Sequence, residues 1–162
     1  MLQPSERIIE FIKSWESFSD KVYICPAGKP TIGYGHVVER DKEVFNSPIT
    51  VNDADRMLRT DIKKRIGWLN SNLPKLSQDQ FDALVSLLFN STNDGNLEKV
   101  APKAVKLIKE GNYYEAAKEL FSREKGLVFI TIKDKVTGER TKQVSNGLAN
   151  RRKAEWAIWC GK

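Results

Sequence analysis

The sequence predicts an α+β protein, mostly α, with a small N-terminal β-hairpin lobe and a larger helical lobe. Apolar residues recur at helical spacing over most of the chain. Near the N-terminus, short β-branched and aromatic segments enclose turn residues, as in a hairpin. The length of 162 residues suits one domain. We therefore expect a single domain over 1–162, with the hairpin lobe at about 19–50 and the helical lobe at about 1–18 and 51–162.

The first helix is expected to begin after Ser5, a residue type that caps helix N-termini well. Apolar residues at helical spacing predict a wide buried face, comprising Ile8, Ile9, Phe11, Ile12, Trp15 and Phe18. Glu16 emerges from the same side near the end of this helix. A carboxyl group is therefore expected where the first helix meets the hairpin.

The N-terminal hairpin is predicted from strands over 22–24 and 31–34, which enclose the turn Pro26–Pro30. Cys25 ends the outgoing strand and Thr31 begins the returning one. Their side chains are therefore expected to face each other across the turn.

The helical lobe is predicted from five further periodic segments, which are 50–69, Ser77–Phe89, 100–110, 113–121 and 148–159. The first of these is expected to begin at Asn52 or Asp53. The second is apolar on nearly all sides, which is typical of a central helix in a bundle. Trp156 and Trp159 in the last segment are expected in the core.

A second hairpin is predicted near 127–144. The segment 127–132 is β-branched and aromatic, 134–138 supplies a turn, and 139–144 can return as a strand. No function for this segment follows from its sequence.

The charge balance favours polyanionic partners without choosing among them. Lys and Arg number 27 against 21 Asp and Glu, a net charge of +6. The basic residues are scattered and form no aromatic platform for single strands, so we expect no nucleic acid partner. An anionic cell wall or membrane surface fits the charge equally well.

Cysteine and histidine usage predicts neither a disulfide framework nor a metal site. The chain has two cysteines and one histidine, so no zinc or other cofactor is expected. A bridge between Cys25 and Cys160 stays open for an oxidising compartment. No apolar stretch is long enough to span a membrane, and Met1–Pro4 resembles no secretory signal. Synthesis in the cytoplasm is expected.

Three polar residues suggest a catalytic site, because they follow the spacing Glu16-x8-Cys25-x5-Thr31. A carboxylic acid at a helix end faces two small polar side chains on a hairpin. Such a group can protonate a leaving oxygen and hold a water, as glycoside hydrolysis requires. The usual second carboxylate is replaced here by the thiol of Cys25.

This spacing resembles that of the phage-type lysozymes of glycoside hydrolase family 24, the endolysins of tailed phages. Its members carry Glu-x8-(Asp or Cys)-x5-Thr, and the text around Cys25–His36 is similar to the lambdoid branch with Cys at the middle position. Phe81–Asn90 resembles the central helix of the family, and Gly147–Glu155 resembles its closing helix. The chain departs from the family at Ser91-Thr92, where many members have a Val-Gly type pair, and in the larger 127–144 segment.

The resemblance implies a two-lobed lysozyme-like fold and a monomeric muramidase that hydrolyses the MurNAc-β-1,4-GlcNAc bond of peptidoglycan with inversion, lysing the host cell. The enzyme would be made in the host cytoplasm and reach the wall after release by a holin. Glu16 is expected to be the general acid, Cys25 to position water or give electrostatic support, and Thr31 to orient the water. A covalent role for the thiol is the alternative.

Further residues are expected around this trio. Substrate contacts are assigned to Gly33, Tyr34, Gly35 and Asn90, and support to His36, Arg151 and Arg152. One of the two arginines is expected to pair with Glu16 or a neighbouring carboxylate, and His36 to brace the hairpin against the first helix.

Two other functions stay open at this point. A lytic transglycosylase would replace water by the 6-hydroxyl of the sugar and give 1,6-anhydro-MurNAc. A catalytically weak, wall-binding lysozyme-like protein would explain the missing carboxylate at Cys25. The products released from peptidoglycan distinguish them.

Overall fold

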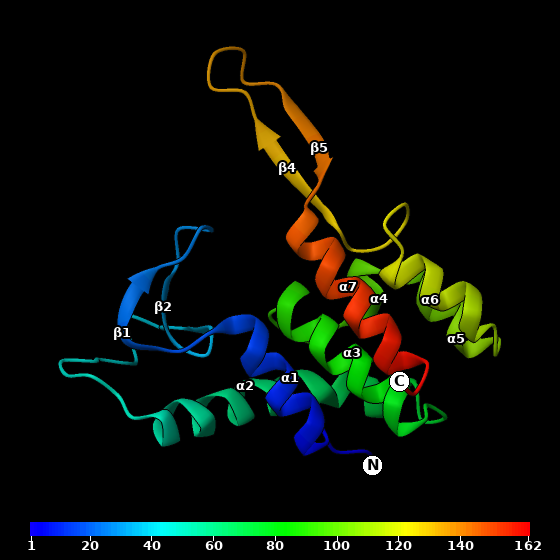
Figure 1. The fold of residues 1–162 in the computed structure, drawn as a ribbon, viewed down its shortest axis with the longest axis horizontal. Helices are drawn as coiled ribbons and strands as arrows, with labels where there is room; N and C mark the ends of the chain where they lie inside the picture. The colour runs from blue at the N-terminus through cyan, green and yellow to red at the C-terminus, as the bar shows by residue number, and fades with distance from the viewer.

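The computed structural model describes residues 1–162 and has the predicted α+β class, with helices dominating. Its elements are α1 (Glu6–Glu16), β1 (Ser19–Ile24), β2 (Pro30–Gly33), β3 (His36–Val37), α2 (Val51–Asn72), α3 (Gln78–Ser91), α4 (Leu97–Val100), α5 (Pro102–Lys109), α6 (Tyr113–Phe121), β4 (Phe129–Lys133), β5 (Arg140–Val144) and α7 (Asn146–Trp159). The small sheet β1-β2-β3 lies beside the helices, while β4 and β5 project away from them (Figure 1).

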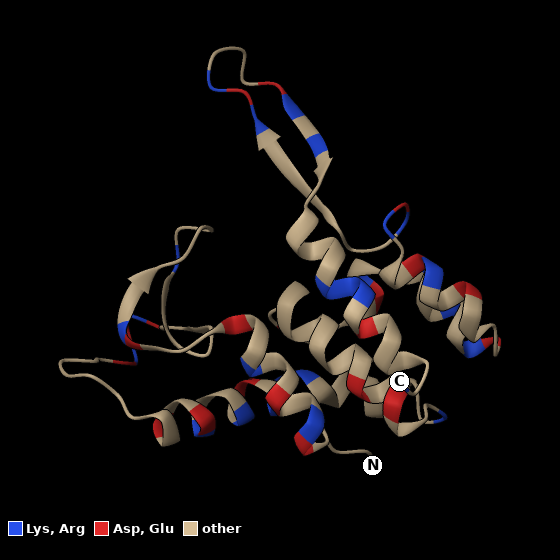
Figure 2. Ribbon diagram, in the orientation of Figure 1, with Lys and Arg blue, Asp and Glu red and all other residues tan.

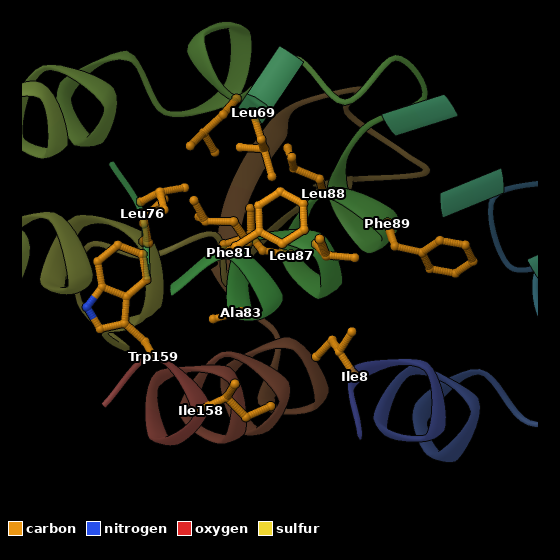
Figure 3. Close-up of a cluster of buried hydrophobic side chains, with 14 of the residues drawn as sticks. Ile8, Leu69, Leu76, Phe81, Ala83, Leu87, Leu88, Phe89, Ile158 and Trp159 are labelled. Carbon is orange, nitrogen blue, oxygen red and sulfur yellow. The ribbon is translucent and has the colours of Figure 1, made fainter. Parts of the chain in front are cut away.

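α3 is the central helix, as its apolar sequence predicts. Every residue from Phe81 to Phe89 is buried. The helix is capped by Ser77, whose side chain accepts from the Gln80 N–H while Gln80 reaches back to the cap. Phe81 and its neighbours on α3 pack between α1, α2 and α7 (Figure 3). This core fixes the helix whose C-terminal end faces the hairpin lobe.

α1 joins the two lobes. Ser5 caps it as predicted, and Ile8, Ile9 and Ile12 are buried against the helical core. The prediction that Trp15 and Phe18 are buried on the same face is wrong, because both are more than a third exposed. The helix has left the core by this point, so its last turn stands at the boundary of the two lobes.

The hairpin lobe is a three-stranded antiparallel sheet. Tyr23 pairs with Thr31, and Ile24 with Pro30. The short strand β3 has no counterpart in the sequence prediction. Its residue His36 pairs with Ile32 of β2. Two residues are too few to give a periodic signal.

Two helix boundaries differ from the prediction for local reasons. α2 begins at Val51, because Thr50 rather than Asn52 or Asp53 is the cap and forms a capping box with Asp53. The helix predicted over 100–110 corresponds to α5, which begins only at Pro102, whereas Val100 ends the short helix α4 and Ala101 separates the two. Pro102 explains the break, since it lacks an N–H and restricts the preceding residue.

The second predicted hairpin is present as β4 and β5. Its strands pair in an unbroken antiparallel register from Phe129–Val144 to Lys133–Arg140. All residues of both strands except the half-buried Val144 are exposed, so the hairpin packs against the helices only at its base. Among the helices, none combines the length and apolar character needed to cross a membrane.

Candidate active site

Glu16 is the last residue of α1, where the chain leaves the helix abruptly. Ser17 is the one non-glycine residue with a positive φ, 57°, and its N–H still donates to the Lys13 carbonyl. This turn directs the chain into β1 and leaves the Glu16 carboxyl at the lobe boundary. The side chain of Glu16 is 20% exposed, and its Oε1 lies 2.6 Å from Nη1 of Arg151.

Arg151 is held by a buried ionic network on α7. Its Nε lies 3.3 Å from Oε1 of Glu155, and the Ser86 hydroxyl donates to the same oxygen at 2.6 Å. Nε of Arg152 lies 2.8 Å from Oε2 of Glu155 without hydrogen-bond alignment. Burial raises the pKa of Glu155 and lowers that of Arg152 to about 10. The network fixes the guanidinium that contacts Glu16.

Gly35 brings the backbone of the hairpin lobe against the Glu16 carboxyl. A Cβ at Gly35 would lie 2.8 Å from Oε2 of Glu16, and φ at Gly35 is +78°. Both features favour glycine, because a side chain would collide with the carboxyl and strain the backbone. The carboxyl thus pairs with Arg151 and occupies the space that the missing side chain of Gly35 leaves.

Gly35→Ala is expected to displace the Glu16 carboxyl and to lower activity by about two orders of magnitude, the loss that a misplacement of about 1 Å can cause. The comparison variant is Gly111→Ala, where φ is +81° and nothing lies within 4 Å of the added Cβ. Both variants should lose about 1–2 kcal/mol of stability from backbone strain. Turnover and thermal unfolding are measured for both. Equal activities of the two variants would contradict the displacement of Glu16.

Cys25 directly follows β1 and Thr31 is the second residue of β2, and both line the same groove as Glu16. The Cys25 N–H donates to the Lys29 carbonyl at 2.9 Å, which closes the turn. A hydrogen bond from the Lys29 backbone lowers the pKa of the Cys25 thiol. The turn therefore favours the thiolate form of Cys25, which the sequence alone does not predict. Thr31 is buried, and its hydroxyl donates to the Lys29 carbonyl at 3.0 Å.

A groove of about 460 Å³ joins these residues. One wall carries Glu16, Cys25, Thr31 and Gly35, and the opposite wall is the end of α3 and the loop after it, including Phe89 and Asn90. The predicted contact residue Asn90 and the predicted trio therefore border the same space. A carboxyl, a thiol and a hydroxyl around an open groove can donate a proton and position a water for attack on a bound ligand.

Arg65 borders the groove and is missed by the sequence analysis. Its Nε donates to the Thr92 carbonyl at 3.0 Å, and its guanidinium lies over the Phe89 ring. It thereby holds the loop that forms the far wall. Burial lowers the pKa of Arg65. α2 carries many charged residues, so no pattern in the sequence distinguishes this one.

Two predicted substrate contacts lie away from the groove. A Cβ at Gly33 would meet Ala54 of α2 at 3.2 Å, so this glycine serves the packing of the lobe on α2. The ring of Tyr34 packs near Phe18 and under the ammonium of Lys13. β2 ends at Gly33, where φ is +65°, and Tyr34 and Gly35 form the turn before β3, so the alternation of a strand does not apply to them.

The two predicted support residues Arg151 and Arg152 contact different parts of the site. Arg151 contacts Glu16, whereas Arg152 donates to Asn90 Oδ1 at 2.8 Å and to Ser91 at 3.1 Å. Arg152 therefore fixes the far wall of the groove rather than Glu16.

The two cysteines, Cys25 and Cys160, are both free thiols. No group of three or more His, Cys, Asp or Glu is placed to hold a metal ion.

His36 braces the hairpin lobe, but against α2 rather than the first helix. Its Nδ1 lies 2.7 Å from Asp61 Oδ2, and its Nε2 lies 3.0 Å from both oxygens of Glu43. Two carboxylates facing both ring nitrogens suit the doubly protonated imidazolium. The hydrogen bond that the Nδ1–H donates to the Asp61 carboxylate accordingly raises the pKa of His36, and Glu43 adds to this effect.

The stability contributed by His36 is expected to fall as pH rises. Its folded pKa lies above the unfolded value of about 6.5, so its contribution is complete below pH about 6.5 and is lost as pH rises through the folded pKa. The difference in unfolding free energy between the parent and His36→Gln should therefore shrink with increasing pH. Urea titrations between about pH 5.5 and 9 measure it. A difference that stays constant or grows with pH contradicts this assignment.

Comparisons with known proteins find relatives of this chain in sequence and in fold. A family model described as phage lysozyme matches residues 13–155. The chain is 33% identical over 156 residues to the endolysin of Acyrthosiphon pisum secondary endosymbiont phage 1, covering 96% of each. It superposes on the endolysin from Escherichia coli O157:H7 phage FAHEc1 with a TM-score of 0.77 at 29% identity, covering 98% of this chain and 93% of the other. The muramidase domain of SpmX from Asticaccaulis excentricus gives 0.76 at 27% identity, with 98% of both chains covered.

Proposed function

Because the chain belongs to the phage lysozyme family, and is therefore a lysozyme-type glycoside hydrolase, we propose that it is an endolysin that cleaves the β-1,4 bond between MurNAc and GlcNAc in peptidoglycan. Lysis of the host cell, after release to the wall through a holin, is the biological role we propose. The observation that carries the proposal is the single groove bordered by Glu16, Cys25 and Thr31.

Glu16 is the proposed general acid. In its protonated form it donates to the glycosidic oxygen as the bond to the anomeric carbon of MurNAc breaks. Arg151, 2.6 Å from the carboxyl, then stabilises the carboxylate that remains. Gly35 leaves the space that this carboxyl occupies, because a Cβ at that position would lie 2.8 Å from Oε2 of Glu16.

Cys25 and Thr31 are the proposed water-binding groups. The Thr31 hydroxyl donates to the Lys29 carbonyl, so its remaining lone pair can accept a hydrogen bond from a water. The lowered pKa of the Cys25 thiol favours its thiolate form, whose negative charge would stabilise a sugar that becomes oxocarbenium-like. The water oxygen bonds to the anomeric carbon from the face opposite the leaving group, which inverts the configuration, and the attacking water releases one proton to solvent water in the open groove.

The identity of the cleaved bond is tested by reducing the new sugar ends. Purified sacculi are digested with the enzyme, and the digest is treated with borohydride before acid hydrolysis. We expect muramicitol as the reduced amino sugar, because the new reducing end is MurNAc. Glucosaminitol instead would show cleavage of the other glycosidic bond and would overturn this part of the proposal.

A further inference from the structure

A second groove continues from the proposed active site towards the β4–β5 hairpin. Its volume is about 580 Å³, and it is lined by Phe129, Thr131 and Lys142 of the hairpin together with the segment Lys125–Leu127. Asn90 and Ser91 line both this groove and the one that contains Glu16. A chain-like ligand that occupies the first groove therefore reaches the hairpin without leaving the surface.

One face of the hairpin borders this second groove. Phe129, Thr131 and Lys142 lie on the same face, because Thr131 and Lys142 are directly paired and Phe129 is two residues from Thr131. The next pair outward on that face is Lys133 and Arg140. The face thus runs from an aromatic ring at its base to a row of cations.

The cations on this face have no partner in the protein. Lys133, Arg140 and Lys142 are exposed and take part in none of the ion pairs of the structure. Lys133 and Arg140 are directly paired across the two strands, and like charges in such a pair destabilise the hairpin. Figure 2 shows basic residues along β5 and at the outer end of β4, with acidic ones at the turn. A bound anion would remove this repulsion.

The charge of peptidoglycan lies mainly on its peptide stems. In a glycan strand that carries peptide stems, the lactyl group of MurNAc is joined to the peptide through an amide. The sugars are therefore neutral, and the peptide stems carry the carboxylates. We propose that the cationic face of the β4–β5 hairpin, defined by Lys133, Arg140 and Lys142, binds the carboxylates of a peptide stem on the glycan strand held at Glu16. This inference rests on the proposed function and assigns the segment 127–144 to substrate selection.

The test uses one substrate in two forms. Soluble, uncrosslinked glycan strands with intact stems are compared with the same strands after their carboxylates have been converted to amides with carbodiimide and ammonia. The enzymes are the parent, the variant Lys133→Gln/Arg140→Gln/Lys142→Gln, and a charge-matched control, Lys106→Gln/Lys109→Gln/Lys162→Gln. The control residues are exposed and line neither groove.

We expect the hairpin variant to lose about tenfold in kcat/KM on the native strands, mainly through KM, as three exposed charge contacts can provide. On the amidated strands it should match the parent. Amidation should lower kcat/KM of the parent by the same factor, a test that needs no variant to fold. The control should behave like the parent on both substrates, and its unfolding temperature serves as the reference for the hairpin variant.

Two results would overturn the inference while leaving the proposed function intact. The hairpin variant could equal the parent on native strands, or it could lose activity equally on both substrates. If the parent cleaves neither the native nor the amidated strands, the proposed function is overturned, and the inference with it.

Discussion

Glu16→Gln is expected to lower turnover on peptidoglycan by about 10²–10⁴-fold, the range that a general acid contributes. The amide has nearly the shape of the carboxyl but cannot give a proton to the glycosidic oxygen. The side chain is only 20% exposed, pairs with Arg151 and occupies the space that Gly35 leaves, so a group of the same size is the appropriate replacement. Release of reducing ends from purified sacculi measures the effect, with thermal unfolding as the check on folding.

Cys25→Ser is the control in the same experiment. Serine keeps a small polar group on the turn, so the variant should retain much of the activity if the thiol positions the water. Complete loss in Cys25→Ser would give the thiol a covalent or proton-accepting role. Near-parental activity in Glu16→Gln would remove Glu16 from the role of acid.

Glu155→Leu is expected to destabilise the protein by about 3–5 kcal/mol, because removing one member of a buried ionic network leaves its partners uncompensated. Arg151 and Arg152 would remain side by side, with side chains 5% and 0% exposed. A domain of ordinary stability has about 5–15 kcal/mol in total, so a large share is lost. The unfolding temperature should fall by roughly 6–20 °C.

The double variant Arg152→Met/Glu155→Leu separates charge from packing. It removes a cation together with the anion, so it should recover part of the stability lost in Glu155→Leu. Chemical denaturation of the parent and both variants gives the comparison. A Glu155→Leu variant as stable as the parent would show that the network contributes nothing to folding.

Local features of the fold are predictable from the sequence because neighbouring residues determine them. Ser5 and Ser77 cap the helices that follow them, and the apolar surface of the second of these helices requires a central position. The hairpin near 127–144 is likewise visible in its β-branched residues and turn. These signals span only a few residues and need no knowledge of the rest of the chain.

Features that depend on how distant segments pack are not predictable in this way. Gly33 and Tyr34 share the motif of the groove residues, but contacts with Ala54 and Phe18 place them elsewhere. Arg65 enters the site only because α2 passes beneath the loop at Thr92. The spacing of the trio predicts the chemistry we propose for it, whereas its surroundings depend on the tertiary structure.

The most direct test of hydrolysis by water at this site is digestion of purified sacculi in water enriched in ¹⁸O, followed by mass spectrometry of the fragments. If Glu16 protonates the leaving oxygen while a water held near Cys25 and Thr31 attacks, each new MurNAc end carries one ¹⁸O atom and is reducing. The reducing end is fixed with borohydride immediately, before oxygen exchange. Fragments ending in 1,6-anhydro-MurNAc without ¹⁸O would show that the 6-hydroxyl of the sugar replaces the water, and would contradict the account.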